Sequence, residues 1–129
     1  MESAFRITVK CGGSTKRAFN QVVLEFPDSD YEELLDLGVA SSLLATTAEV
    51  WEPRFAVITH TSLTANVRTA ADGFRPGWLT YLPHDSTRAA GAHEITTYVR
   101  DVSTLGQIFA VTDRYENASP DMLEPWSAV

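Results

Sequence analysis

The stretch "RPGWLTYLP", residues 75–83, places one Trp, one Tyr and two Leu between two prolines. Its middle, "WLTYL", has the composition of a β-strand. Because successive side chains of a strand point to opposite faces, Trp78 and Leu82 share one face and Tyr81 lies on the other. We therefore expect Trp78 and Leu82 in the core, and Tyr81 either against the helices or at the sheet surface.

The rest of the chain supplies further strands around this one. Alternating or β-branched apolar residues, which are typical of strands, occupy five more stretches: "FRITVK" (5–10), "NQVVLEF" (20–26), "RFAVITH" (54–60), "EITTYVRDV" (94–102) and "QIFAVTD" (107–113). Residues 83–93 are expected to form a loop, and a turn is expected at Gly106.

Three helices are predicted between and after these strands. Acid-rich residues 28–51 favour one helix, with Gly38 as a candidate interruption. A short second helix follows Ser62, and a last one has Ser119 as its cap and Pro120 at its first position.

These elements alternate along the chain without a repeat or a linker. We predict an α+β fold: a single domain over residues 1–129, with a mixed, mostly antiparallel sheet of about six strands and about three helices packed on one face.

The length and composition fit one globular domain. The chain has 129 residues, of which 44% are hydrophobic and 21% charged, which argues against disorder. Its apolar runs are far shorter than the about 20 residues that span a bilayer, and residues 1–10 lack the pattern of a signal peptide. One cysteine, Cys11, excludes an internal disulfide. We therefore expect a cytoplasmic protein with no membrane partner.

Negative charge is concentrated in one part of the chain. The formal net charge is −7 at pH 7, and residues 18–53 carry eight acids and no base. Such a block repels phosphate, which disfavours nucleic-acid binding, and it steers a basic partner toward the protein. The alternative is a solvated helix face that keeps the protein soluble. The candidate partner-binding residues are Asp28, Asp30, Glu32, Glu33, Asp36, Glu49 and Glu52.

No arrangement of residues predicts catalysis. The histidines, His60, His84 and His93, contain no i, i+4 pair of the kind that holds zinc on a helix. The segment "CGGSTK" (11–16) lacks the spacing of a phosphate-binding loop. Nothing in the sequence links Cys11 to a His that would activate it as a nucleophile. We therefore predict no catalytic residue, no metal site and no cofactor, and we favour a binding role.

Four longer fragments form an ordered series along the chain. They are "CGG" (11–13) followed by "NQVVLEFP" (20–27), then "VWEPRFAVITHTSL" (50–63), then "RPGWLTYLP" (75–83), and last an apolar strand that runs into "VTDRYENASPDML" (111–123). In this order they resemble the immunity protein 52 family of bacterial polymorphic toxin systems.

The resemblance implies a cytoplasmic immunity protein that binds a cognate toxin and blocks it. Toxins of this family are often nucleases of the restriction-endonuclease fold, and an acidic surface can cover the basic cleft of a nuclease. We expect the acids to make the contact while Trp78 and Tyr81 serve as scaffold. The alternative is that Trp78, Tyr81 and Tyr115 are exposed aromatic anchors for the partner.

Two other classes of function stay open at this point. One is a small ligand-binding or enzymatic domain that uses the polar residues His84, His93 and Asp113–Tyr115. The other is a structural component of a phage or of a secretion machine. A pocket that holds His and carboxylate groups together would favour the first of these.

Overall fold

The computed structural model describes residues 6–10, 21–26, 36–60, 63, 67, 70 and 73–128, with the backbone alone for residues 6–10, 26, 116 and 128. The strands are β1 (Arg6–Lys10), β2 (Gln21–Phe26), β3 (Phe55–His60), β4 (Leu79–Pro83), β5 (Tyr98–Val102) and β6 (Gly106–Ala110). The α-helices are α1 (Leu37–Trp51), α3 (Ala89–Ile95) and α4 (Pro120–Leu123), and the 3-10 helices are η1 (Tyr115–Asn117) and η2 (Glu124–Ala128).

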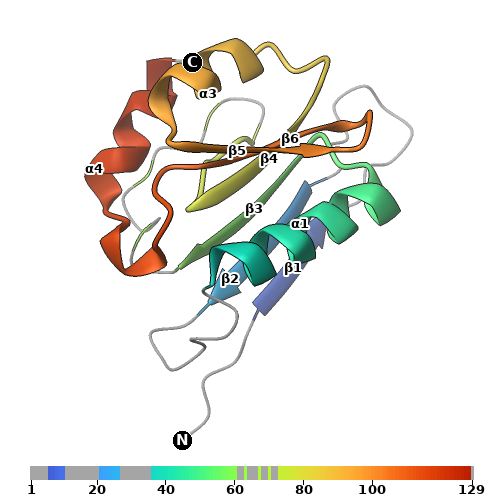
Figure 1. The fold of residues 1–129 in the computed structure, drawn as a ribbon, viewed down its shortest axis with the longest axis horizontal. Helices are drawn as coiled ribbons and strands as arrows, with labels where there is room; N and C mark the ends of the chain where they lie inside the picture. The colour runs from blue at the N-terminus through green and yellow to red at the C-terminus, as the bar shows by residue number, and fades with distance from the viewer. Residues whose placement is uncertain are drawn as a thin grey trace, which may run out of the picture.

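The six strands form one sheet in the order β1-β2-β3-β4-β6-β5 (Figure 1). Four neighbouring pairs are antiparallel, and β2 with β3 is the one parallel pair. A parallel pair needs a crossover connection, and α1 lies in the connection between these two strands. The predicted α+β fold with a mixed, mostly antiparallel sheet is therefore confirmed.

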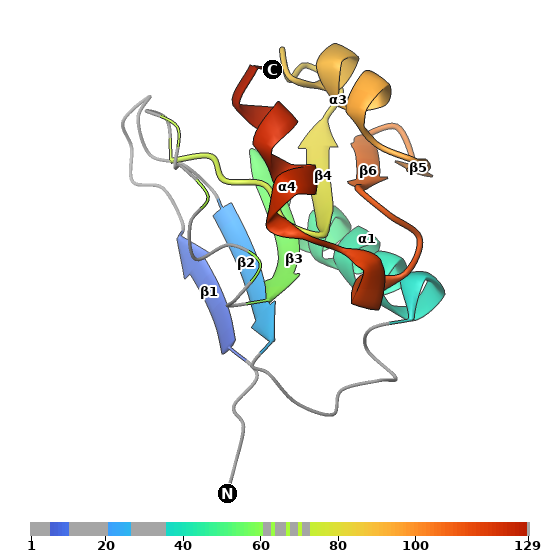
Figure 2. The same cartoon turned by 90° about the vertical axis from the view of Figure 1, so that its left-hand side faces the viewer.

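Helices cover both faces of the sheet, and the expectation that they pack on one face is wrong. In Figure 2, α4 lies in front of β3 and β4, whereas α1 lies behind the sheet. Arg100 of β5 reaches α1, and on the opposite face the ring of Phe109 lies 5.1 Å from that of His93 in α3. The physical reason lies in β4, because its two faces both carry large apolar side chains that must be removed from water.

The central strands form the core of the domain. All six residues of β3 are buried, and so are Leu79, Thr80, Tyr81 and Leu82 of β4. The largest fully buried side chains are those of Trp78, Tyr81 and Phe109. The expected core position of Trp78 and Leu82 is confirmed, and Tyr81 packs on the α1 side.

Helix α1 begins one residue after Asp36, whose Oδ2 accepts a hydrogen bond of 3.1 Å from the N–H of Val39. Residues 27–35, where the sequence predicts the first part of this helix, lie outside the described residues. Gly38 lies in the first turn and does not interrupt the helix. The face toward the sheet consists of the buried residues Ala40, Ser41, Leu44, Ala45 and Ala48, at the spacing of one helix face.

The segment expected as a loop contains a helix. Residues 89–95 form α3, in which three alanines favour the helix and Ala92 is fully buried. The strand that follows therefore begins at Tyr98 and not at Glu94. The turn between β5 and β6 lies between Val102 and Gly106. Gly106, where the sequence predicts the turn, is the first residue of β6 and pairs with Pro83.

The last helix has the predicted start, with Ser119 as its cap and Pro120 at its first position. It passes directly into η2, which brings Trp126 into the core at 3% exposure. Of the second predicted helix, only Leu63, Val67 and Ala70 are described. Within the described part of the chain, no helix combines the length and the apolar character needed to cross a membrane.

Candidate functional site

The acids predicted to bind a partner do not form one cluster. Four of them, Asp28, Asp30, Glu32 and Glu33, lie outside the described residues. The other three are exposed, but Asp36 lies at the start of α1, and Glu49 and Glu52 lie at its end. At 1.5 Å rise per residue, about 20 Å separates the two groups. Moreover, Asp36 caps the helix, so its carboxylate already has a structural role.

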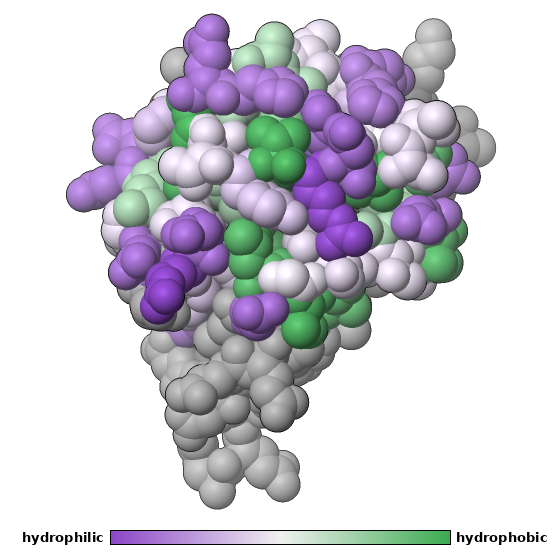
Figure 3. All heavy atoms as spheres, viewed as in Figure 1, coloured by the Kyte–Doolittle hydropathy of each residue, from purple (hydrophilic) through white to green (hydrophobic). Residues whose placement is uncertain are grey.

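The C-terminal end of α1 combines these acids with exposed apolar side chains. Val50 is 70% exposed and Trp51 is 47% exposed, and Glu49 and Glu52 flank them. Over α1, Figure 3 shows hydrophobic residues interspersed with polar ones. We call Glu49, Val50, Trp51 and Glu52 the α1 end surface.

Tyr81 of β4 is buried, and the negative charge of Glu52 acts on its hydroxyl. Burial raises the pKa of the Tyr81 phenol above its ordinary value, and the negative charges of Glu52 and Asp85 raise the pKa further. The two carboxylates therefore lie close enough to the same hydroxyl to disfavour its ionised form.

Glu52 also carries backbone strain. It ends α1 in the left-handed region, with φ 43° and ψ 55°, and its N–H donates to the carbonyl of Ala48 at 2.9 Å. Glycine adopts this conformation freely, whereas another residue costs about 1 kcal/mol or more. A left-handed residue is a common way for a helix to end, so the conformation of Glu52 accounts for the end of α1.

The aromatic anchors proposed from the sequence are not on the surface. Trp78 and Tyr81 are 0% and 1% exposed, and the Trp78 Nε1 donates to the carbonyl of Thr112 at 2.9 Å. An exposed hot spot at these two residues is therefore wrong, because β4 is a central strand covered on both faces. Tyr115 is half-buried, with its ring 5.4 Å from that of Trp78 and 5.6 Å from that of His60.

The three histidines lie in separate surroundings. His60 is buried at the end of β3, and the exposed His84 follows β4. The Nε2 atom of His93 lies 3.0 Å from Oε1 of Gln107. Among the described residues, no group of three His, Cys, Asp or Glu side chains could hold a metal ion.

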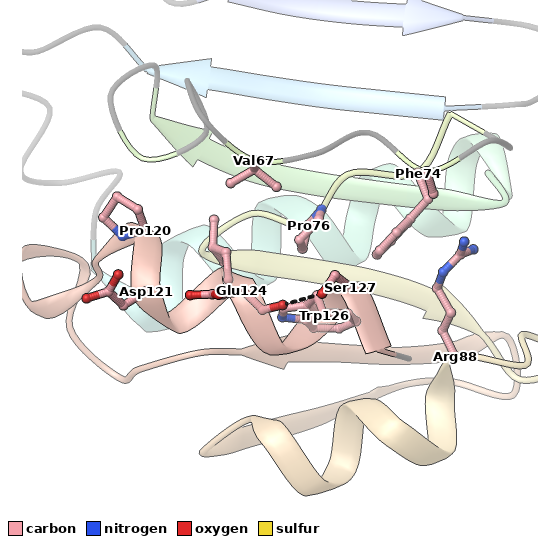
Figure 4. Close-up of a pocket in the computed structure, with 11 residues that line it drawn as sticks. Val67, Phe74, Pro76, Arg88, Pro120, Asp121, Glu124, Trp126 and Ser127 are labelled. Atoms are coloured by element: carbon pink, nitrogen blue, oxygen red, sulfur yellow. Dashed lines mark hydrogen bonds between the residues drawn. The ribbon is translucent and has the colours of Figure 1, made fainter.

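A groove of about 620 Å³ lies on the other face of the sheet, between the segment before β4 and the chain's last two helices (Figure 4). Aromatic, aliphatic and proline side chains line it together with one base and two acids: Val67, Ala70, Phe74, Pro76, Arg88, Pro120, Asp121, Leu123, Glu124, Trp126 and Ser127. No histidine lines it, so the polar residues proposed from the sequence for a ligand site do not form this groove.

Sequence reasoning missed this groove because its walls come from distant parts of the chain. The signals present were weak ones, namely the prolines and the Trp of "SPDMLEPW" (119–126). A short α-helix followed by a 3-10 helix has no long periodic pattern that would indicate which side chains face inward.

Comparison of the chain with protein-family models, with curated proteins and with solved structures gave no match.

Proposed function

We propose that this protein is an immunity protein, which binds a toxin with a basic surface and neutralises it in the cytoplasm. The observation that carries the proposal is the α1 end surface. There, a Val that is 70% exposed and a Trp that is 47% exposed lie between the exposed acids Glu49 and Glu52 in the chain. The order of sequence fragments that resemble the immunity protein 52 family supports the same function.

Apolar side chains at this position favour contact with another protein. Trp is among the residues that contribute most to binding when a partner covers them. Full burial of a side chain such as that of Val50 is worth about 1.5–3 kcal/mol relative to exposure. The helix itself gains little from Val50 and Trp51, because both have lower helix propensity than Ala or Leu.

The charges of the surface determine the kind of partner. Two carboxylates accompany the two apolar side chains, and Arg54 is the exposed base nearest to them in the sequence. The whole chain carries a net charge of −7. A basic protein is therefore attracted and nucleic acid is repelled. A nuclease toxin fits this surface, because it presents a basic cleft to its own phosphate substrate.

The proposal is tested by co-expression with the product of the adjacent upstream gene, followed by measurement of binding. We expect this protein to restore growth, and Trp51→Ala to weaken binding by about 30-fold, the change that corresponds to a hot-spot loss of about 2 kcal/mol. Two exposed valines on the same helix allow a matched comparison. Val50→Ser lies in the surface and should weaken binding, whereas Val39→Ser, at the other end of α1, should not.

The contribution of the negative charges to binding is measured separately, through the rate of association. Glu49→Lys should slow association and reduce its dependence on salt, whereas Glu94→Lys on α3 should leave both unchanged. Charge reversal at Asp28, Asp30, Glu32 and Glu33 tests the acids of the preceding segment in the same assay. Growth that is the same with and without this protein refutes the proposed function. Equal effects of Val50→Ser and Val39→Ser refute the assignment of the surface.

A further inference from the structure

The groove on the face opposite α1 contains a buried donor without a partner. Trp126 is 3% exposed and lines the groove, and no acceptor among the described residues pairs with its Nε1. More than nine-tenths of buried polar groups in native proteins are paired, and an unpaired one is costly. Figure 4 shows the indole nitrogen at the end of the ring that is directed toward Glu124. An occupant of the groove that offers an acceptor would satisfy this donor.

The two ends of the groove differ in charge (Figure 4). Asp121 and Glu124, three residues apart on consecutive helical turns, are both exposed at one end. At the other end the guanidinium of Arg88 lies over the ring of Phe74, 4.3 Å from its centroid. Asp121 and Glu124 are both carboxylates, so they favour a cation at this end of the groove.

Between these ends the groove is apolar. Phe74 and Trp126 lie with their rings 5.7 Å apart, and Pro76 and Leu123 extend the apolar lining. The volume of about 620 Å³ falls within the range of ligand-binding clefts. An occupant with an apolar side chain would bury it against these rings.

We propose that this groove binds a short extended peptide segment of a partner protein, in which an apolar residue is followed by Lys or Arg. The apolar side chain packs on Phe74 and Trp126, a peptide carbonyl accepts from the Trp126 Nε1, and the basic side chain lies between Asp121 and Glu124. The net charge of −7 favours such a cationic segment over an acidic one. The site is separate from the α1 end surface, which lies on the other face of the sheet.

The test uses two synthetic peptides, both acetylated and amidated: Ala-Leu-Lys-Ala and its acidic counterpart Ala-Leu-Glu-Ala. Each is titrated into the ¹⁵N-labelled protein while the three Trp indole resonances are followed. The Trp126→Phe variant identifies the Trp126 signal by its loss. We expect that signal to move saturably with the basic peptide at concentrations near 1 mM, on the order of a weak site, and the acidic peptide to bind at least threefold more weakly.

Variants separate the contribution of the two carboxylates to peptide binding from that of the Trp126 donor. Asp121→Asn combined with Glu124→Gln should weaken the basic peptide about fivefold and remove its advantage over the acidic one. Trp126→Phe, which removes the donor and keeps a ring, should weaken both peptides about fivefold, as followed through the backbone amides of the groove residues. Glu94→Gln, an exposed acid on α3, is the matched control and should change nothing.

Absence of a saturable shift overturns the proposal, and so does equal affinity for the two peptides. A shift of Trp126 that occurs only with small aromatic carboxylates would also overturn it, because it would assign the groove to a small molecule held by Arg88. Since no toxin enters this experiment, its failure leaves the proposed immunity function intact.

Discussion

Replacement of Arg100 by Met tests how α1 is held to the edge of the sheet. Arg100 lies on β5, the last strand of the sheet, and its Nη1 donates to the Oγ atoms of Ser41 and Ser42 in α1 at 2.9 and 3.0 Å. Ser41 is fully buried, and its own hydroxyl donates to the carbonyl of Gly38 at 3.2 Å. Met keeps an unbranched apolar stem, so the change removes the guanidinium and preserves much of the packing.

The expected loss follows from these two bonds. A hydrogen bond to a charged group contributes about 1.5–3 kcal/mol. The bond to the exposed Ser42 competes with water, so most of the effect comes from the buried Ser41. We expect Arg100→Met to lower the free energy of unfolding by about 2 kcal/mol. With roughly 2.1 cal/mol/K of unfolding entropy per residue, the 129 residues give a fall in Tm of about 7 °C.

The assay is urea unfolding of Arg100→Met, Ser41→Ala and the double variant. The double-mutant cycle cancels the small gain in helix propensity that Ser41→Ala brings. We expect a coupling energy of about 1–1.5 kcal/mol between Arg100 and Ser41, and a change within about 0.5 kcal/mol for Ser42→Ala. A coupling energy below about 0.3 kcal/mol would show that the two residues act independently and would refute this account of how α1 is attached.

Two further predictions concern the end of the sheet near the α1 end surface. A Cβ at Gly106 would lie 2.7 Å from the Cα of Pro83 and still closer to the carbonyl oxygen of Leu82. Gly106→Ala should therefore lower the free energy of unfolding by about 3 kcal/mol. An unchanged midpoint of urea unfolding would contradict this prediction. Because the pKa of Tyr81 is raised in the folded protein, its contribution to stability is complete below the unfolded value of 10.0 and is lost as the pH rises toward the folded pKa. Between pH 8 and pH 10.5, the free energy of unfolding of Tyr81→Phe should therefore fall less than that of the unaltered protein. Equal falls would show that burial and Glu52 do not raise the pKa of Tyr81.

The candidate site was only partly predictable from the sequence. Glu49 and Glu52 were expected to be exposed, and they are. Trp side chains are mostly buried in folded proteins, yet Trp51 is 47% exposed. It continues the stripe of Leu44 and Ala48 at helical spacing, so the apolar stripe extends beyond the part that the sheet covers. Trp126 lies in the core because a 3-10 helix, which has no strong sequence signal, places it there.

Local patterns were sufficient for most of the strands and for the start of the last helix. Period-two alternation and β-branched residues indicate a strand wherever they occur, and Ser119 with Pro120 indicates a helix start, because both depend on neighbours in the chain. The distribution of α1, α3 and α4 over the two faces of the sheet was not encoded in any short segment. It depends on contacts such as those of Phe109 with His93 and Trp126, which residues far apart in the chain make only after folding. For the same reason the burial of Tyr81, the exposure of Val50 and the groove beside Trp126 follow from the assembled fold.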